Sequence, residues 1–235
     1  MRGAVCPRED ADVGSVVIRF VRAFRPRVVL LENVHAYRRH PTFLDFIAGC
    51  KKLGYHTDFE IVDADEHGVP SSRRRLVARA SLDPLPPWPA PQRPISWLES
   101  VRDIIGTFAP DKLAPWQLAR VRRLQQHRDQ YPLKYPWLIS SNDVASHRFN
   151  EGKVVRVARG ANEPAFTIAS TYKAMSQTRV LYEDGRVTLV TPRGLARFQS
   201  FPDEYDLPAD AALAVKVVGN AVPTALSRAL IESFL

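Results

Sequence analysis

The sequence has few cysteines and no long apolar run, and these absences exclude several classes of protein. Cys6 and Cys50 are too few for a disulfide framework or a four-cysteine zinc site, so we expect a reducing environment and no metal. Cys50 falls within an apolar helical pattern, which predicts a core residue. Residues 1–14 lack the apolar core of a signal peptide, and no stretch has the length of a membrane span. A cytoplasmic protein without membrane association is therefore expected.

Glycine is also scarce, and acidic residues are outnumbered by basic ones. The 11 glycines are fewer than the 19 prolines, which indicates that some loops are stiff. Lys and Arg total 33 against 25 Asp and Glu, so the formal charge is +8. Such an excess favours a polyanionic partner, nucleic acid first and an acidic membrane second. A merely basic surface is the alternative, because net charge alone does not identify a ligand.

The first part of the sequence alternates between helix and strand patterns. Apolar residues recur at helix spacing over 13–24 and 43–53. Residues 28–31 form a continuous aliphatic run, and two further strand patterns occupy 56–64 and 75–80. Helices that alternate with strands are typical of α/β units. We expect an α/β fold with an incomplete, doubly wound and mostly parallel sheet.

Prolines separate this part from a less regular region. Residues 83–94 contain too many prolines for a helix or a central strand. The basic helix and short strands that follow predict a smaller, inserted α+β region. A helix then begins at Thr191 as N-cap with Pro192 in its first turn, and Gly219 and Asn220 predict a turn before a last helix that packs on the sheet. The expected division is 1–80, 81–190 and 191–235.

A carboxylate stands at the end of the aliphatic strand. The segment RPRVVLLENV places Glu32, and then Asn33, directly after that run. In open parallel sheets ligands bind beyond the carboxyl ends of the strands, so Glu32 is a candidate site residue. The alternative is an acid that caps the following segment or pairs with Arg38 or Arg39.

Three arginines follow a Gly-Val-Pro turn in residues 68–75. Side chains alternate along a strand, so Arg73 and Arg75 should share one face and Arg74 should occupy the other. Two guanidinium groups on one face could hold a carboxylate, a phosphate or a base carbonyl. The alternative is a solvated basic loop, the usual fate of a charge run.

Four segments, taken together, resemble the DNA cytosine-5 methyltransferases. They are RPRVVLLENV, DADEHGVPSSRRRLVARA, TPRGLARFQSFPDEY and VVGNAVPTALSRAL. The family has Glu-Asn-Val after a strand, then Gly-Val-Pro-Gln-x-Arg-x-Arg, an Arg-x-x-Ala-Arg-x-Gln-x-Phe-Pro-Asp helix and Gly-Asn-Ala-Val-Pro. Each motif alone is weak, but the ordered set covers nearly all of the chain. Residues 81–190 then correspond to the variable target-recognition region.

The resemblance implies methyl transfer from S-adenosylmethionine to C5 of cytosine in DNA, in an enzyme of restriction-modification type. Such enzymes add a cysteine thiolate to C6 of an extruded base, and protonation at N3 helps the addition. Glu32 matches the family's glutamate that binds N3 and the exocyclic amine, and a pKa raised by burial would suit that role. Arg75 matches an arginine near the base O2, where negative charge builds up, and Arg73 accompanies it as a catalytic candidate. Asn33 matches a residue that holds the nucleophile loop.

The resemblance also implies donor and DNA contacts. Asn220 and Ala221 are similar to positions that line the methyl-donor site, with a plain helix cap as the alternative. Thr167 lies in a segment that resembles the one after the recognition loops and is expected to touch the DNA backbone. The basic helix offers side chains that contact phosphates or face water, namely Arg120, Arg122, Arg123 and Arg128.

The chain departs from the family pattern in three places. The glycine-rich donor motif and the Pro-Cys loop are both absent, and Ser71 replaces the family's glutamine. Cys6 lies too close to Glu32 and stands before its proline instead of after it. We interpret Cys6 as a lone thiol and assign no nucleophile within this chain.

Three origins are consistent with these departures. The chain is a subunit of a split enzyme completed by a partner chain, a truncated relic, or a product whose true start lies upstream. A missing first strand would leave a sheet edge and helix faces bare, so poor solubility or obligate association is expected.

Two classes of function compete. One is a methyltransferase component that acts on DNA, and the other is a catalytically inactive DNA-binding or regulatory module; an RNA-directed relative is a third option. The pair of Glu32 and Arg75 favours the first class, and the missing cysteine favours the second.

Overall fold

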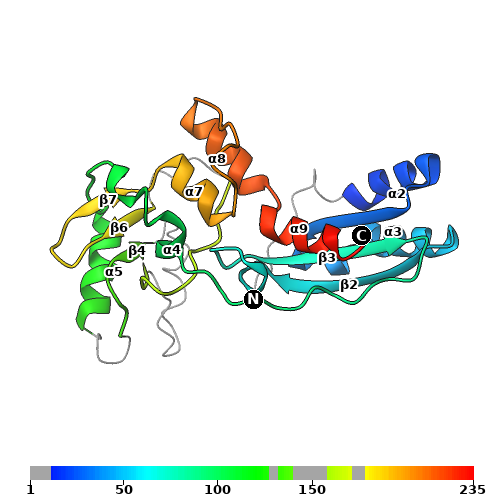
Figure 1. Cartoon of the computed structure of the whole chain (residues 1–235), viewed down its shortest axis with the longest axis horizontal. Coiled ribbons are helices and arrows are strands. Elements are labelled where there is room, and N and C mark those ends of the chain that lie inside the picture. The colour runs from blue at the N-terminus through cyan, green and yellow to red at the C-terminus, as the bar shows by residue number, and fades with distance from the viewer. Residues whose placement is uncertain (1–11, 127–131, 140–157, 171–177) are drawn as a thin grey trace.

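A computed structural model describes residues 12–126, 132–139, 158–170 and 178–235. The molecule is elongated, with one sheet and its helices at each end and α7 and α8 between them (Figure 1). Cys6 and Arg128 lie outside the described residues, so the structure says nothing of either prediction.

The first layer contains the expected alternation of helix and strand. Its elements are α2 (Val13–Phe24), β1 (Val28–Val34), η1 (His35–Arg39), α3 (Pro41–Lys52), β2 (His56–Asp63), η2 (Ala64–His67) and β3 (Arg74–Ser81). The apolar faces of α2 and α3 cover one side of the sheet, where Cys50 is fully buried as predicted. Helices that alternate with strands around a sheet confirm the α/β class.

The strand directions correct the expectation of a mostly parallel sheet. The strand order is β1-β3-β2, and β3 pairs antiparallel with both neighbours. β1 and β2 do run in the same direction, as a crossover through α3 requires. The link from β2 to β3 contains only η2 and a short loop, which is too short for a parallel crossover, so β3 returns antiparallel between them.

A second, smaller antiparallel sheet follows the proline-rich segment. Its strand order is β5-β4-β6-β7, and it packs with two α-helices and a 3-10 turn. The elements are α4 (Trp97–Val101), η3 (Ile105–Thr107), α5 (Pro115–Gln126), β4 (Trp137–Ile139), β5 (Ala158–Arg159), β6 (Arg179–Leu181) and β7 (Val187–Leu189). This small, mixed layer is the irregular α+β region that the sequence predicted.

Three helices end the chain: α7 (Pro192–Phe198), α8 (Ala211–Asn220) and α9 (Thr224–Glu232). Thr191 caps α7 by accepting a hydrogen bond from the Gly194 amide, as predicted. The prediction of a turn at residues 219–220 is wrong, because both residues belong to the last turn of α8. Tight packing explains the glycine there, since the Gly219 Cα lies against the backbone of residues 169–170.

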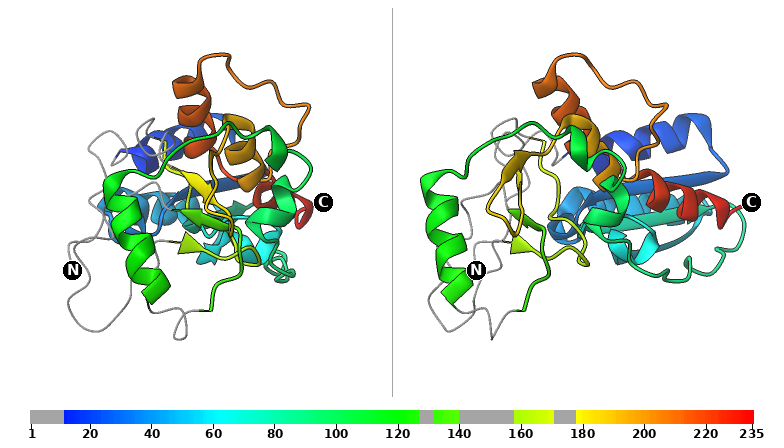
Figure 2. Two further views of the ribbon diagram at one scale, coloured as in Figure 1. Left: turned by 90° about the vertical axis from the view of Figure 1, so that its left-hand side faces the viewer. Right: turned by 60° about the vertical axis from the view of Figure 1, so that its left-hand side comes forward.

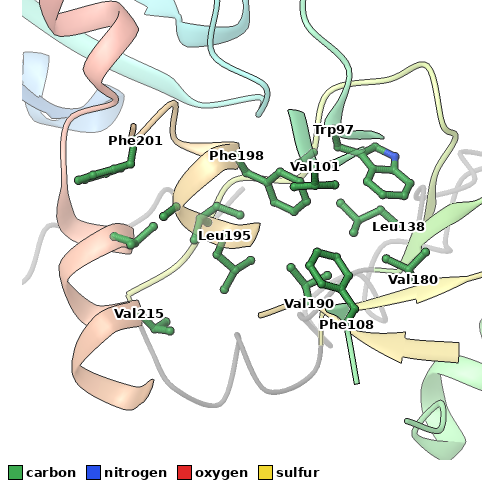
Figure 3. Close-up of a cluster of buried hydrophobic side chains, with 14 residues drawn as sticks. Trp97, Val101, Phe108, Leu138, Val180, Val190, Leu195, Phe198, Phe201 and Val215 are labelled. Atoms are coloured by element: carbon green, nitrogen blue, oxygen red, sulfur yellow. The ribbon is translucent and has the colours of Figure 1, made fainter. Parts of the chain in front are cut away.

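The C-terminal helices divide between the two layers. Buried side chains of α7 and α8 share a core with the second region, which Figure 3 shows around Leu195, Phe198, Trp97 and Val180. α9 packs on the first sheet through Leu226 and Leu230, as the sequence predicted. The expected boundary at residue 191 therefore divides the chain in sequence but does not divide its core, because α7 and α8 join the two layers.

The proline-rich segment is fastened to β3 by a buried arginine. The Arg79 guanidinium makes two hydrogen bonds to Asp58, of 2.9 and 2.6 Å. The Cζ atom of the same guanidinium lies 3.8 Å from the centre of the Trp88 ring. Residues 83–94 consequently follow the sheet surface as an ordered connection.

Within the described residues, no helix is long and apolar enough to cross a membrane. The same residues contain no group of three or more acidic, histidine or cysteine side chains that could hold a metal ion.

Candidate active site

The register of β1 and β3 brings the predicted acid and one predicted arginine together. Glu32 pairs with Val77, and Val34 pairs with Arg75. Opposed residues of antiparallel strands point to the same face, so Glu32 and Arg75 are diagonal neighbours on it. This is the face that α9 covers, opposite to α2 and α3.

The two side chains form a largely buried ion pair. Arg75 Nε lies 2.9 Å from Glu32 Oε1, and the side chains are only 15% and 19% exposed, respectively. Glu32 Oε1 has no further partner among the described residues, so it keeps acceptor capacity. Arg75 also donates from Nη1 to the carbonyl of Arg74, at 2.8 Å. Glu32 is thus paired with Arg75, and not with either arginine of η1.

Burial controls the protonation of this pair. Desolvation raises the pKa of Glu32 above its ordinary value, and this effect exceeds the opposing attraction of Arg75 and Arg73. Desolvation also lowers the pKa of Arg75, although Glu32 partly offsets it. Glu32 therefore takes up a proton at a higher pH than an exposed glutamate does.

Arg73 is buried near the pair and bonds to backbone carbonyls. Its side chain is 3% exposed and donates to the carbonyls of Ile168, Gly219 and Ala221, at 3.3, 3.2 and 3.1 Å. Burial, assisted by repulsion from Arg75, lowers its pKa to about 10, so it remains charged at neutral pH. We call this set of three contacts the Arg73 clamp. The sequence does not predict it, because every residue has a backbone carbonyl and no motif marks the ones that Arg73 reaches.

The loop before β3 is fixed to the segment that contains Thr167. A parallel bridge joins Ser71 to Ala165, and the Ser72 amide donates to the Ala165 carbonyl at 2.9 Å. The Thr167 hydroxyl donates to the Ser72 carbonyl, and the contact of Thr167 with the DNA backbone stays a prediction. Ser71, at the position of the family's glutamine, is fully buried with no hydrogen-bond partner for Oγ.

The third motif has a structural role that holds α7 in place. Arg197 forms ion pairs with Asp103 and Asp203, and Arg193 donates to the carbonyls of Pro202 and Tyr205. In the same motif, the Gln199 amide donates to the Val218 carbonyl of α8 at 3.1 Å. These contacts fix the end of α8 against which Arg73 bonds.

The remaining candidates lie at the border of the site or far from it. Asn33 Oδ1 accepts a hydrogen bond from the Val34 amide at 2.7 Å, which orients the chain after Glu32. Asn220 is exposed, whereas the Ala221 carbonyl is engaged by Arg73. The arginines of α5 lie at the other end of the molecule, as Figure 1 shows. Arg120 stacks over Trp116 at 4.9 Å, and Arg122 is exposed beside a groove between α5 and the β6–β7 hairpin.

A family model for C-5 cytosine-specific DNA methylases matches residues 9–235. The chain belongs to that family. The Type II methylase M.HgiDII of Herpetosiphon aurantiacus is 27% identical, over 92% of this chain and 66% of its own length. The Type II methyltransferase M1.BsuMI of Bacillus subtilis is 28% identical, over 90% of this chain and 52% of its own. The chain thus spans about half to two thirds of the length of these curated relatives.

Solved structures confirm the fold of the chain. A DNMT2 mutant from Spodoptera frugiperda superposes with a TM-score of 0.63 at 15% identity, over all of this chain and 76% of that one. A putative DNA modification methyltransferase encoded within an Escherichia coli prophage gives a TM-score of 0.60, over 97% of this chain. At these identities the likeness establishes the architecture alone.

Proposed function

We propose that the chain is the C-terminal portion or subunit of a DNA cytosine-5 methyltransferase of Type II restriction-modification kind. The observation that carries the proposal is the buried pair of Glu32 and Arg75, placed on one face by the register of β1 and β3. The family match and the Type II relatives support the reaction class. In this role the chain acts on DNA inside the cell.

The pair is suited to a pyrimidine that has left the duplex. Cytosine presents N3 and an exocyclic amine on one edge, and O2 beside them. A protonated Glu32 donates to N3, and its raised pKa increases the protonated fraction near neutral pH. Arg75 offers positive charge at O2, where electron density grows when a thiolate adds to C6. Extrusion of the base is required because the pair is largely buried.

The attacking thiolate is not supplied by the described residues. Cys50 is their one cysteine; it is fully buried under α2, and desolvation raises its pKa to about 11. We therefore assign the nucleophile to a partner chain or to a preceding segment. We propose that Asn33, whose Oδ1 accepts a hydrogen bond from the Val34 amide, contacts the loop that carries the nucleophile.

The end of α8 offers few unoccupied groups to a methyl donor. Asn220 presents an exposed amide at the end of α8, but the neighbouring carbonyls of Gly219 and Ala221 are already bonded to Arg73. S-adenosylmethionine would supply the electrophilic methyl group in this family. We propose that Asn220 and Ala221 border its site and that the rest of it comes from outside the described residues.

A non-catalytic DNA-binding module of the same fold is the second candidate. It is favoured by the inert environment of Cys50, since a binding module needs no thiolate. A binding module does not explain, however, why Glu32 is buried beside an arginine so that its pKa is raised. A truncated relic would share these features without activity.

Labelled methyl transfer separates the two candidates. The chain would be combined with a polypeptide that carries the donor-binding and Pro-Cys motifs, labelled S-adenosylmethionine and DNA. We expect label on cytosine only when both polypeptides are present. Glu32→Gln should reduce turnover at least 100-fold and change DNA affinity less than three-fold, because it keeps the side-chain shape but cannot supply the acid's proton. Equal losses of turnover and affinity would contradict the role of Glu32.

A further inference from the structure

Two arginines that follow the strand of Glu32 have no partner among the described residues. η1 begins at His35, the next residue after β1, and contains Arg38 and Arg39. Both side chains are exposed, and within the described part of the chain neither forms an ion pair or a hydrogen bond. Glu32, which could have neutralised one of them, is paired with Arg75 instead. The end of β1 therefore carries positive charge with which no described acid pairs.

A buried tyrosine holds this short helix in place. Tyr37 is 1% exposed, and its hydroxyl oxygen accepts a hydrogen bond from the Gly14 amide at 2.8 Å and lies 2.7 Å from Thr42 Oγ1. A 3-10 helix turns by about 120° per residue, so the inward side chain of Tyr37 leaves Arg38 and Arg39 on the two other sides. η1 also packs against β3. The two arginines are thus presented from a fixed backbone at the edge of the candidate site.

The position of the Glu32–Arg75 pair indicates what this charge can bind. Under the proposed function the pair holds an extruded cytosine, and that nucleotide stays joined to its strand by a phosphate on each side. Glu32 lies near the end of β1, so the phosphates of a base held there lie around the start of η1. A guanidinium suits such a group, because its planar fork of donors matches two phosphate oxygens.

We propose that Arg38 and Arg39 bind the phosphates that flank the extruded cytosine. This inference rests on the proposed function, because η1 meets these particular phosphates only if the base lies between Glu32 and Arg75. The contact is distinct from the one expected at α5, which lies at the other end of the molecule. Its binding energy offsets part of the cost of unstacking the base. Arg38 and Arg39 are therefore binding residues and take no part in the chemistry.

The test uses the full chain and duplexes in which one cytosine faces an abasic site, so that extrusion of the cytosine costs little. In one duplex the linkages on both sides of this cytosine are neutral methylphosphonates, and in a second the same two substitutions lie near one end. Fluorescence anisotropy at a series of salt concentrations gives the affinities. We expect the flanking methylphosphonates to weaken the binding of wild type at least five-fold more than the terminal ones do.

The combination of Arg38→Gln and Arg39→Gln removes the two charges from η1. This double variant should bind the unmodified duplex at least ten-fold more weakly than wild type. The slope of log affinity against log salt should fall by about 1.8, since each phosphate contact contributes about 0.9. The flanking methylphosphonates should weaken its binding no more than the terminal ones do, because the contacts that they remove are already absent.

The combination of Lys51→Gln and Lys52→Gln is the matched control. These lysines are also exposed and adjacent, and they end α3, whereas η1 precedes its first turn. The control carries the same change of net charge, and it should keep the wild-type slope and the wild-type response to the flanking methylphosphonates. Circular dichroism should show equal melting temperatures for wild type and both double variants, because the substituted side chains are exposed.

Three outcomes would overturn the proposal: a wild-type chain that does not bind the duplex, a wild-type slope in the η1 variant, or an equal effect of the flanking methylphosphonates on wild type and on that variant. A wild-type slope would leave an acidic segment of a partner protein as the ligand of η1. If the expected coupling is found but the complete complex transfers no methyl group to DNA, the phosphate contact stands and the proposed function fails. Methyl transfer without the coupling is the reverse result.

Discussion

At the scale of single residues, the protonation of Glu32 depends on a competition between burial and two arginines. Burial raises its pKa and Arg75 opposes that rise. Arg75→Gln should therefore raise the pKa of Glu32 further, as measured by carbon NMR of labelled glutamate during a pH titration. Arg74→Gln is the matched control, because Arg74 is exposed on the other face beside Asp63. An unchanged pKa in Arg75→Gln would show that the ion pair is not formed in solution.

The same pKa shift has a consequence for stability. A raised pKa in the folded state means that the folded chain binds the Glu32 proton more tightly than the unfolded chain does. The stability linked to that proton is complete below the unfolded pKa and is lost as the pH rises through the folded pKa. In Arg75→Gln this loss should be larger than in wild type, which urea unfolding at a series of pH values above 4.5 would measure.

Arg73 should contribute more to the stability of the folded chain than to its affinity for DNA. Arg73→Met leaves three backbone carbonyls without their donor, and we expect a loss of about 3 kcal/mol in the free energy of unfolding. Arg73→Lys should recover only part of it, because one ammonium group cannot reach all three carbonyls in the geometry of a guanidinium fork. Urea unfolding of both variants checks this, and a loss below 1 kcal/mol in Arg73→Met would contradict the clamp.

At the scale of elements, local patterns predicted most helices and strands but not their partners. Apolar spacing located α2, α3 and α9, and the Thr191–Pro192 start of α7, because these signals lie within a few residues. The insertion of β3 between β1 and β2 depends on a loop length and on long-range pairing. The pair of Glu32 and Arg75 was predictable from a motif, whereas the carbonyls that hold Arg73 were not.

The end of α8 shows how such long-range packing constrains one residue. A Cβ atom added at Gly219 would lie 2.5 Å from the backbone of Ala169 and Ser170. Gly219→Ala should therefore cost about 1–3 kcal/mol, although alanine is the better helix former. Gly106→Ala is the control, since nothing lies within 4 Å of its added Cβ and stability should change little. Thermal unfolding of the two variants compares them directly, and equal melting temperatures would refute the tight packing at α8.

At the scale of the whole molecule, Figure 1 and the right-hand view of Figure 2 place α5 and α2 at opposite ends. The shared core of α7, α8 and the second region connects the ends, and Arg73 attaches that core to the loop beside the Glu32–Arg75 pair.

Salt dependence tests whether α5 contacts DNA. Arg122 is exposed on α5, so a phosphate contact there releases counterions when DNA binds. Arg122→Gln should weaken binding and reduce the slope of log affinity against log salt by about 0.9 if it contacts one phosphate. Arg19→Gln, an exposed arginine on α2 at the far end, should leave the slope unchanged. Fluorescence anisotropy over a range of salt concentrations distinguishes the variants, and a wild-type slope in Arg122→Gln would show that Arg122 does not contact phosphate.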